Sequence, residues 1–188
     1  MWRSISCLAL LSLSTAALAD FDYTFVEASY GQTEFDDFDV DGDAIGVGGS
    51  FAVTDSLHLF GGYSTADFDG GVDMNGLQAG LGYRVGLSDA LDVVGSLAFV
   101  RGEIEFLGQS VDDTGYGLGL GLRAMTSPAV ELSGGVSYLD VGDLSDGDTS
   151  IGAGFLYHFT DAFALGLSAS FGEDTNTYAL NGRFSFSQ

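Results

Sequence analysis

Apolar residues alternate one by one with glycine or polar residues over most of the chain. From residue 115 to residue 122, each glycine is followed in turn by Tyr116, Leu118, Leu120 or Leu122, and residues 75–85 repeat the pattern. A period of two places successive side chains on opposite faces of a β-strand. The alternation predicts strands at about 23–33, 44–53, 57–66, 75–86, 91–101, 114–125, 130–139, 149–159, 163–172 and 177–187.

The connections between these segments alternate in length and charge. Those after the even segments are short, whereas those after the odd segments are longer and acidic, at about 34–43, 67–74, 102–113, 140–148 and 173–176. Strands of about ten residues with short turns at one end and longer loops at the other are typical of outer-membrane barrels. We therefore predict an all-β fold: a single transmembrane antiparallel up-and-down β-barrel of about ten strands, with eight as the alternative, acidic extracellular loops and short periplasmic turns.

Aromatic residues on the apolar face gather near both ends of the segments. Tyr30, Tyr63 and Phe99 lie near the long loops, Phe51 and Tyr83 lie near the short turns, and aliphatic residues lie between them. Such rows flank the lipid-facing band of membrane barrels. A soluble β-sandwich would carry Lys, Glu and Thr where this chain has glycine. A calcium-binding β-helix would need a Gly-Gly-x-Gly-x-Asp repeat that the sequence lacks.

The first 19 residues resemble a secretory signal peptide. Arg3 precedes an apolar run from Leu8 to Leu18, and Ala17-Leu18-Ala19 is a small-residue cleavage site. The run is shorter than the roughly 20 residues of a membrane-spanning helix. We therefore expect residues 1–19 to be a signal peptide and residues 20–188 to form the barrel.

Charge and cysteine content argue against several functions. The chain has 27 acidic and five basic residues and a net charge of −22, whereas nucleic-acid binding needs a basic surface. The single cysteine, Cys7, lies in the expected signal peptide, so a disulfide framework and a cysteine zinc site are both excluded.

Some charged residues fall on the glycine-rich face that points into the predicted lumen. Arg84 and Asp92 are eight residues apart across a short turn, and Arg123 and Glu131 repeat that spacing. Closure of the barrel would also bring an arginine of the last strand beside a glutamate of the first. These positions predict a belt of paired charges near the short turns: Glu27, His58, Arg84, Asp92, Arg123, Glu131, His158 and Arg183.

This belt has two interpretations. As a functional element, it is a gate or a selectivity constriction of a channel. As a structural element, it pairs charges that a narrow lumen would otherwise leave isolated, and it ties the strands together.

Candidate residues for catalysis or metal binding are few. No Ser/His/Asp set converges, and both histidines lie away from the outer rim, so we expect no enzymatic activity. Residues 37–43 alternate acids around a glycine as in a calcium loop, but the closing glutamate is missing. We expect no cofactor and no resident metal, with divalent cations only as candidate partners of the acidic loops.

Several short motifs resemble small bacterial outer-membrane β-barrel proteins. The closest resemblance is to proteins of about this length described as diffusible-signal or quorum-sensing-related outer-membrane proteins of xanthomonads. It is carried by residues 23–30 (YTFVEASY), 48–52 (GGSFA), 58–61 (HLFG), 81–83 (LGY) and 93–98 (VVGSLA). The resemblance implies export, insertion by the barrel-assembly machinery and residence in the outer membrane, but no particular activity.

Together these features predict an integral outer-membrane protein that acts as a narrow porin-like channel for small solutes. The alternative is a structural or surface-interaction barrel whose acidic loops bind divalent cations, lipopolysaccharide or another cell. We expect contacts with outer-membrane lipid and lipopolysaccharide, and none with nucleic acid.

Overall fold

The alternating segments form β-strands that account for most of the chain. The computed structural model describes residues 22–35, 40–145 and 147–186, so the expected signal peptide lies outside the described residues. Within those ranges, no helix is long and apolar enough to cross a membrane. The strands are β1 (Phe25–Phe35), β2 (Val40–Ala52), β3 (Leu57–Phe68), β4 (Val72–Ser88), β5 (Leu91–Phe106), β6 (Gln109–Ser127), β7 (Val130–Asp140), β8 (Asp148–His158), β9 (Phe163–Phe171) and β10 (Thr175–Ser185), with a short 3-10 turn, η1 (Gly142–Leu144), after β7.

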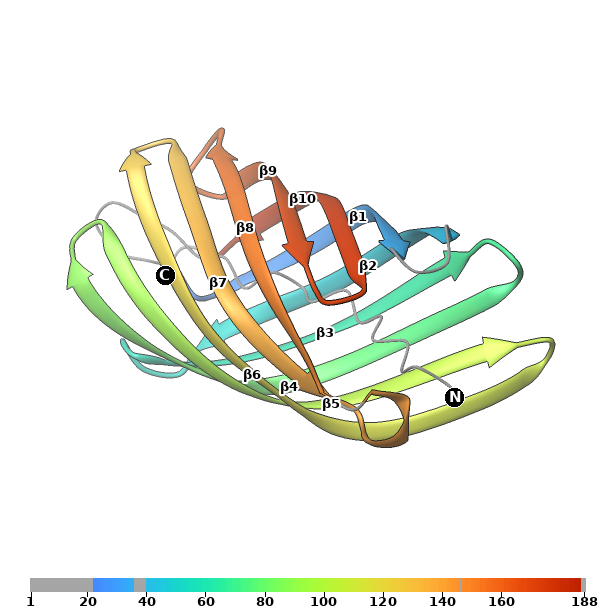
Figure 1. Cartoon of the computed structure of the whole chain (residues 1–188). Coiled ribbons are helices and arrows are strands. Elements are labelled where there is room, and N and C mark those ends of the chain that lie inside the picture. The colour runs from blue at the N-terminus through green and yellow to red at the C-terminus, as the bar shows by residue number, and fades with distance from the viewer. Residues whose placement is uncertain (1–21, 36–39, 146, 187–188) are drawn as a thin grey trace.

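The ten strands form one closed antiparallel barrel (Figure 1). Each strand pairs with its neighbours in the sequence, and β10 closes on β1 with Glu27 opposite Arg183. Closure leaves no sheet edge, so the backbone groups within the ladder are paired even in lipid. The predicted all-β up-and-down barrel is confirmed, with ten strands rather than eight.

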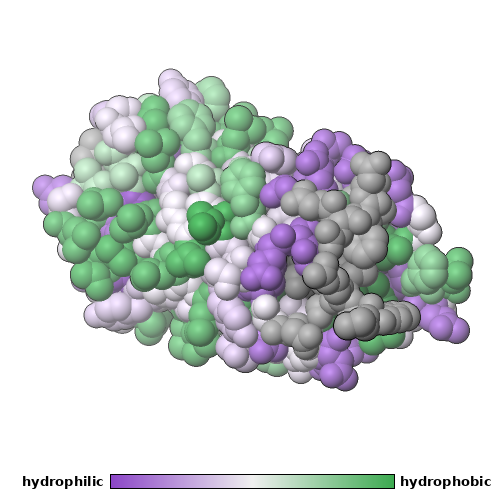
Figure 2. Space-filling model, viewed as in Figure 1, coloured by the Kyte–Doolittle hydropathy of each residue, from purple (hydrophilic) through white to green (hydrophobic). Residues whose placement is uncertain are grey.

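The two faces of the barrel follow the sequence alternation. On β1, Glu27 is buried and its neighbour Val26 is 47% exposed. On β6, leucines such as Leu120 point outward, and the inward positions from 115 to 121 are glycines. In Figure 2, hydrophobic residues cover much of the left part of the surface and strongly hydrophilic residues gather toward the right. A continuous apolar exterior of this kind suits lipid, since soluble proteins rarely expose one.

Exposed aromatic side chains form two rows on the exterior, as the sequence predicts. The row toward the long hairpins contains Tyr30, Tyr63, Phe99, Tyr116, Phe171 and Tyr178. The row toward the short turns contains Phe51, Tyr83, Tyr157, Phe159, Phe163 and Phe184. These rows mark the two membrane–water interfaces of a barrel in lipid.

Two of the predicted acidic loops are largely strand, which corrects their boundaries. The predicted loop 67–74 contracts to a turn after Phe68, because β4 already begins at Val72. The predicted loop 102–113 belongs to β5 and β6 except for Leu107 and Gly108, which turn the chain with φ values of 53° and 76°. The sequence interpretation was wrong here because it took runs of acidic residues as loops.

These hairpins are long because the alternation of inward and outward side chains continues through the acidic residues. Phe35, Ala44, Ala66, Phe68 and Met74 point inward and form a hydrophobic cluster, while the acids between them point outward. An acidic residue on the outer face of a strand that extends beyond the lipid is simply solvated. Charge therefore marked an exposed face and not the end of the ladder.

The residues that follow β7, from 141 to 145, pack against inward-facing side chains of the barrel. Asp113 of β6 accepts hydrogen bonds from the backbone N–H of Asp143, at 2.8 Å, and of Thr114, at 2.7 Å. This anchors η1, and Val141 and Leu144 then pack with a second inward cluster that contains Phe60, Ala98, Val100 and Leu139.

Candidate functional site

The eight residues of the belt lie on inward positions of the strands near the short turns. Six of them are at most 4% exposed: Glu27, His58, Asp92, Arg123, Glu131 and Arg183. The side chains of Arg84 and His158 are 19% and 18% exposed. Three arginines face three carboxylates, so the belt has no net charge when its histidines are neutral. Burial of charges is tolerated only with such pairing.

Glu131 is the acceptor at the centre of the belt. Arg123 donates to its Oε1 from Nε at 3.1 Å and from Nη2 at 2.8 Å. Its Oε2 lies 3.4 Å from Nε2 of His158 and 3.9 Å from Nη1 of Arg183. Since β7 and β10 are not neighbours in the sheet, the last of these contacts crosses the lumen.

A second ion pair joins β1 and β10, the two strands that close the barrel. Arg183 of β10 donates to Oε2 of Glu27 on β1, from Nε at 2.9 Å and from Nη2 at 2.5 Å. The guanidinium carbon of Arg183 also lies 4.2 Å from the centre of the Phe25 ring. Charge-assisted hydrogen bonds of this kind are about twice as strong as neutral ones, so the two ends of the barrel sequence are firmly joined.

The third pair is organised by Tyr23, a residue that the sequence analysis missed. Asp92 accepts from Nη1 of Arg84 at 3.2 Å and from the Tyr23 hydroxyl at 2.9 Å. The guanidinium carbons of Arg84 and Arg123 lie 5.2 Å and 5.4 Å from the centre of the Tyr23 ring, within the range of cation–π attraction. The sequence did contain a clue to this role. Tyr23 lies four residues before Glu27, so a period of two places both side chains on the inward face.

The belt retains unused hydrogen-bonding capacity. His58 Nδ1, Asp92 Oδ1 and the hydroxyl of neighbouring Ser50 are buried and have no hydrogen-bond partner among the described residues. The His58 ring packs on Tyr23 with ring centres 4.5 Å apart, and it occupies the space that a side chain at Gly82 would need. Because buried polar atoms are normally paired, these three atoms are suited to hold water or a polar solute.

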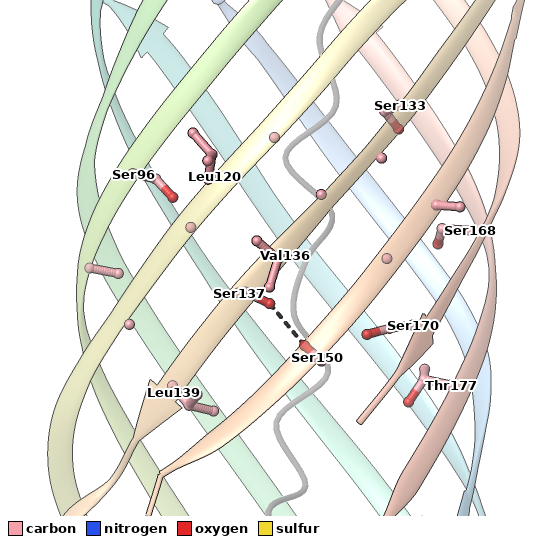
Figure 3. Close-up of a pocket in the computed structure, with 18 of the residues that line it drawn as sticks. Ser96, Leu120, Ser133, Val136, Ser137, Leu139, Ser150, Ser168, Ser170 and Thr177 are labelled. Atoms are coloured by element: carbon pink, nitrogen blue, oxygen red, sulfur yellow. Dashed lines mark hydrogen bonds between the residues drawn. The ribbon is translucent and has the colours of Figure 1, made fainter. Parts of the chain in front are cut away.

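A cavity of about 200 Å³ extends along the lumen from the belt toward the long hairpins. Its polar wall carries hydroxyl groups from β7 to β10 (Figure 3): Ser133, Ser137, Ser150, Ser168, Ser170 and Thr177. Phe60, Val94, Ala98 and Val100 line it from β3 and β5, on the other side of the barrel, and Ser64 and Ser96 of the same strands place two hydroxyls among them. Arg123 lines its belt end.

The glycines of β6 create this space. A Cβ atom on Gly121 would approach no atom closer than 3.6 Å, so the volume in front of it is open. Gly119 differs, because a Cβ there would lie only 2.4 Å from the Ser96 hydroxyl. Larger residues along this strand would therefore reduce the lumen from one side.

Acidic residues cover the exterior of the long hairpins. Asp43 lies opposite Asp67, Asp67 opposite Asp73, and Asp73 opposite Glu105, so one row of carboxylates crosses β2 to β5. Directly opposed like charges are unfavourable, and the barrel must hold this row in place. The described residues include no group of three or more His, Cys, Asp or Glu that could hold a metal ion. Residues 37 and 39 of the predicted calcium loop lie outside them.

Neither histidine is arranged as a catalytic base within the described part of the chain. His158 faces Glu131 and His58 packs on Tyr23, and neither ring forms a hydrogen bond with a serine hydroxyl of the described residues. Side chains of the belt meet across the lumen, and Arg123 of the belt also lines the cavity.

Comparison with protein families identifies the class of protein. Residues 5–171 match the family described as outer membrane protein beta-barrel domain. The chain belongs to this family. It is accordingly an integral protein of the outer membrane, in agreement with its apolar exterior and aromatic rows. No curated protein sequence is significantly similar to it.

Three solved barrels are similar to this chain at low sequence identity. A structure of the KdgM porin in complex with disordered oligogalacturonate has a TM-score of 0.52 and 10% identity, covering 87% of this chain and 99% of that one. The NanC porin has a TM-score of 0.47 and 10% identity, covering 87% and 100%. Ail, the attachment invasion locus protein of Yersinia pestis, has a TM-score of 0.41 and 12% identity, covering 86% and 95%. At 10% identity, the similarity to the KdgM porin shows a common fold and does not by itself assign a function.

Proposed function

We propose that the barrel is a narrow channel for small solutes and that the belt is its constriction. The observation that carries this proposal is a cavity, lined in part by serine hydroxyls, that leads along the lumen to a belt with unsatisfied hydrogen-bonding atoms. Barrels of about eight strands have interiors filled by side chains, whereas about sixteen strands leave a water channel. Ten strands with a glycine-lined interior lie between these cases and support a thin aqueous path.

The same proposal includes the orientation and biogenesis of the barrel. The short turns face the periplasm, the acidic hairpins face outward into the lipopolysaccharide layer, and residues 1–19 are a cleaved signal peptide. The barrel-assembly machinery inserts the protein. We also propose that the protein is related to the xanthomonad outer-membrane proteins and that it has no enzymatic activity.

The acidic exterior gives the channel a preference in charge. The carboxylate row from Asp43 to Glu105 creates a negative potential near the entrance, which raises the local concentration of cations and lowers that of anions. Oligogalacturonate, named for the KdgM porin structure, is an acidic saccharide. The acidic rim of this barrel would repel oligogalacturonate, so we do not propose it as a solute of this channel.

Planar-bilayer conductance of the refolded barrel tests the proposal. We expect the wild-type protein to conduct small ions and to prefer cations over anions. Arg123→Gln, which removes a charge from the constriction, should change the conductance or the ion selectivity. A wild-type barrel that inserts into the bilayer and passes no current would contradict a channel function.

The chain offers a matched control for the constriction. Arg101 pairs with Asp112 at 3.0 Å on the outer surface, where the two side chains are 50% and 51% exposed. Arg101→Gln removes the same type of charge without touching the lumen, and it should leave the conductance through the belt nearly unchanged. Equal effects of the two substitutions would mean that the belt is not the constriction.

A further inference from the structure

We propose that the lumen cavity binds a small, neutral, polyhydroxylated solute, a sugar or a polyol, and that this is the class of solute for which the channel is selective. The inference rests on the proposed channel function and gives it a substrate class.

Serine hydroxyls form the hydrogen-bonding wall. Ser137 and Ser150 bond to each other with their oxygens 2.8 Å apart. The hydroxyls of Ser133 and Ser170 also line the cavity, and they make no hydrogen bond with the described residues. A hydroxyl both donates and accepts, which matches the hydroxyl groups of a polyol. The wall therefore offers partners for several such groups at once.

The facing wall suits the carbon skeleton of such a solute. Phe60, Ala98 and Val100 line the cavity from β3 and β5, and they pack with Leu139 of β7 in the second inward cluster. A sugar ring presents C–H groups beside its hydroxyls, so one side can pack on this surface while the other bonds to the serines. A mostly apolar pocket with a few placed polar groups is typical of small-molecule sites.

The charge distribution selects for a neutral molecule. Arg123 and Asp148 are the charged residues that line the cavity, and Arg123 is already paired with Glu131. A carboxylate on the solute would find no available basic partner in the described lining, and it would also be repelled by the acidic row at the rim. A neutral solute needs no basic partner in the cavity and is not repelled at the rim.

The available space fits a molecule of monosaccharide size. A water needs about 10–15 Å³ on this measure, so the cavity of about 200 Å³ has room for on the order of ten waters. That room depends on the inward glycines of β6, of which Gly121 faces open volume. A large side chain at this position would occupy the site without striking the backbone.

The test compares the refolded protein with Gly121→Leu, using myo-inositol as the probe. Cyclohexanol has a ring of the same size with a single hydroxyl, and glucuronate is a negatively charged sugar acid. Binding is measured in detergent by saturation-transfer NMR, and solute entry is measured by swelling of liposomes that contain the barrel. Gly95→Leu is the matched control, since Gly95 lies on the outward face of β5 with no atom within 4 Å of an added Cβ.

We expect saturable binding and entry of myo-inositol, weak binding of cyclohexanol, and entry of glucuronate roughly tenfold slower at low ionic strength. Gly121→Leu should abolish the binding of myo-inositol, and Gly95→Leu should retain it. Ser133→Ala combined with Ser170→Ala should weaken binding roughly tenfold through the loss of two hydrogen bonds, even if Gly121→Leu fails to fold.

The two proposals fail in different ways. If myo-inositol and cyclohexanol bind equally, or if the serine variant binds myo-inositol as the wild type does, the substrate class is wrong, while ion conductance of the same protein still supports a channel. If myo-inositol binds but no current passes, the site is supported and the channel is overturned.

Discussion

Arg123 donates two hydrogen bonds to a single carboxylate oxygen of Glu131, at 3.1 Å and 2.8 Å, and both side chains are 1% exposed. The two residues lie on β6 and β7, on either side of a short turn. Removing one member of such a buried pair leaves the other charge without its main partner, which is more costly than the loss of an exposed pair.

Arg123→Gln should therefore lower the free energy of unfolding by about 3–5 kcal/mol, or less where lumen water screens the charge. Combining it with Glu131→Gln should restore part of that loss. Denaturant unfolding of the refolded barrel in lipid gives the coupling energy of this double-mutant cycle. Arg101→Gln, at the exposed pair, should cost only about 0–1 kcal/mol. A coupling energy near zero for Arg123 and Glu131 would show that the two side chains do not interact in the folded protein.

A charge placed on the lipid-facing surface should strongly destabilise the barrel. Leu120 points outward in the apolar band, so Leu120→Arg should lower the free energy of unfolding by about 2–4 kcal/mol. Gly121→Ser is the suitable control, because its side chain enters the open lumen. Refolding titrations in lipid measure both changes. Equal losses would show that the inward and outward faces of β6 are wrongly assigned.

The pH dependence of the barrel mouth should depend on Asp113. This residue lies beyond Tyr116 of the aromatic row, and the N–H groups of Asp143 and Thr114 hold the pKa of its carboxyl below the ordinary value of 3.8. Because its pKa is lowered in the folded protein, the carboxylate stabilises the fold at pH values above its ordinary pKa. This contribution is lost as the pH falls through the lowered pKa. We therefore expect η1 to be anchored at neutral pH and released in strong acid.

Hydrogen exchange of the Asp143 amide measures this release. The amide should be protected in the wild type at neutral pH and should lose protection as Asp113 is protonated. In Asp113→Asn, which removes the titrating group, protection should no longer change through that pH range. An identical acid response in the two proteins would assign the release to other carboxylates.

The orientation of the barrel can be tested with single cysteines in intact cells. Gln109 lies beside the tip of the hairpin between β5 and β6, and Asp161 lies in the short turn between β8 and β9. A membrane-impermeant maleimide should label Gln109→Cys in intact cells, and it should label Asp161→Cys only after the outer membrane is permeabilised. The reverse pattern would invert the proposed topology.

The sequence alone predicts the number of strands, their two faces and the partners within each hairpin. A period of two fixes which residues point inward, and a short turn fixes which inward residues lie side by side. That is why the spacing of Arg84 from Asp92, repeated by Arg123 and Glu131, places the members of each pair on adjacent strands. The same local rule did not locate the hairpin tips, because acidic residues occur both in loops and on the solvated faces of extended strands.

Only the tertiary structure decided which residues meet across the lumen. Tyr23 reaches Asp92 of β5, and Arg183 of β10 approaches Glu131 of β7, although none of these strands are neighbours. The hydroxyl wall and the apolar wall likewise come from opposite sides of the barrel. Such contacts depend on how the closed sheet curves and on how much volume each inward side chain leaves free. Periodicity along one strand carries no information about either quantity.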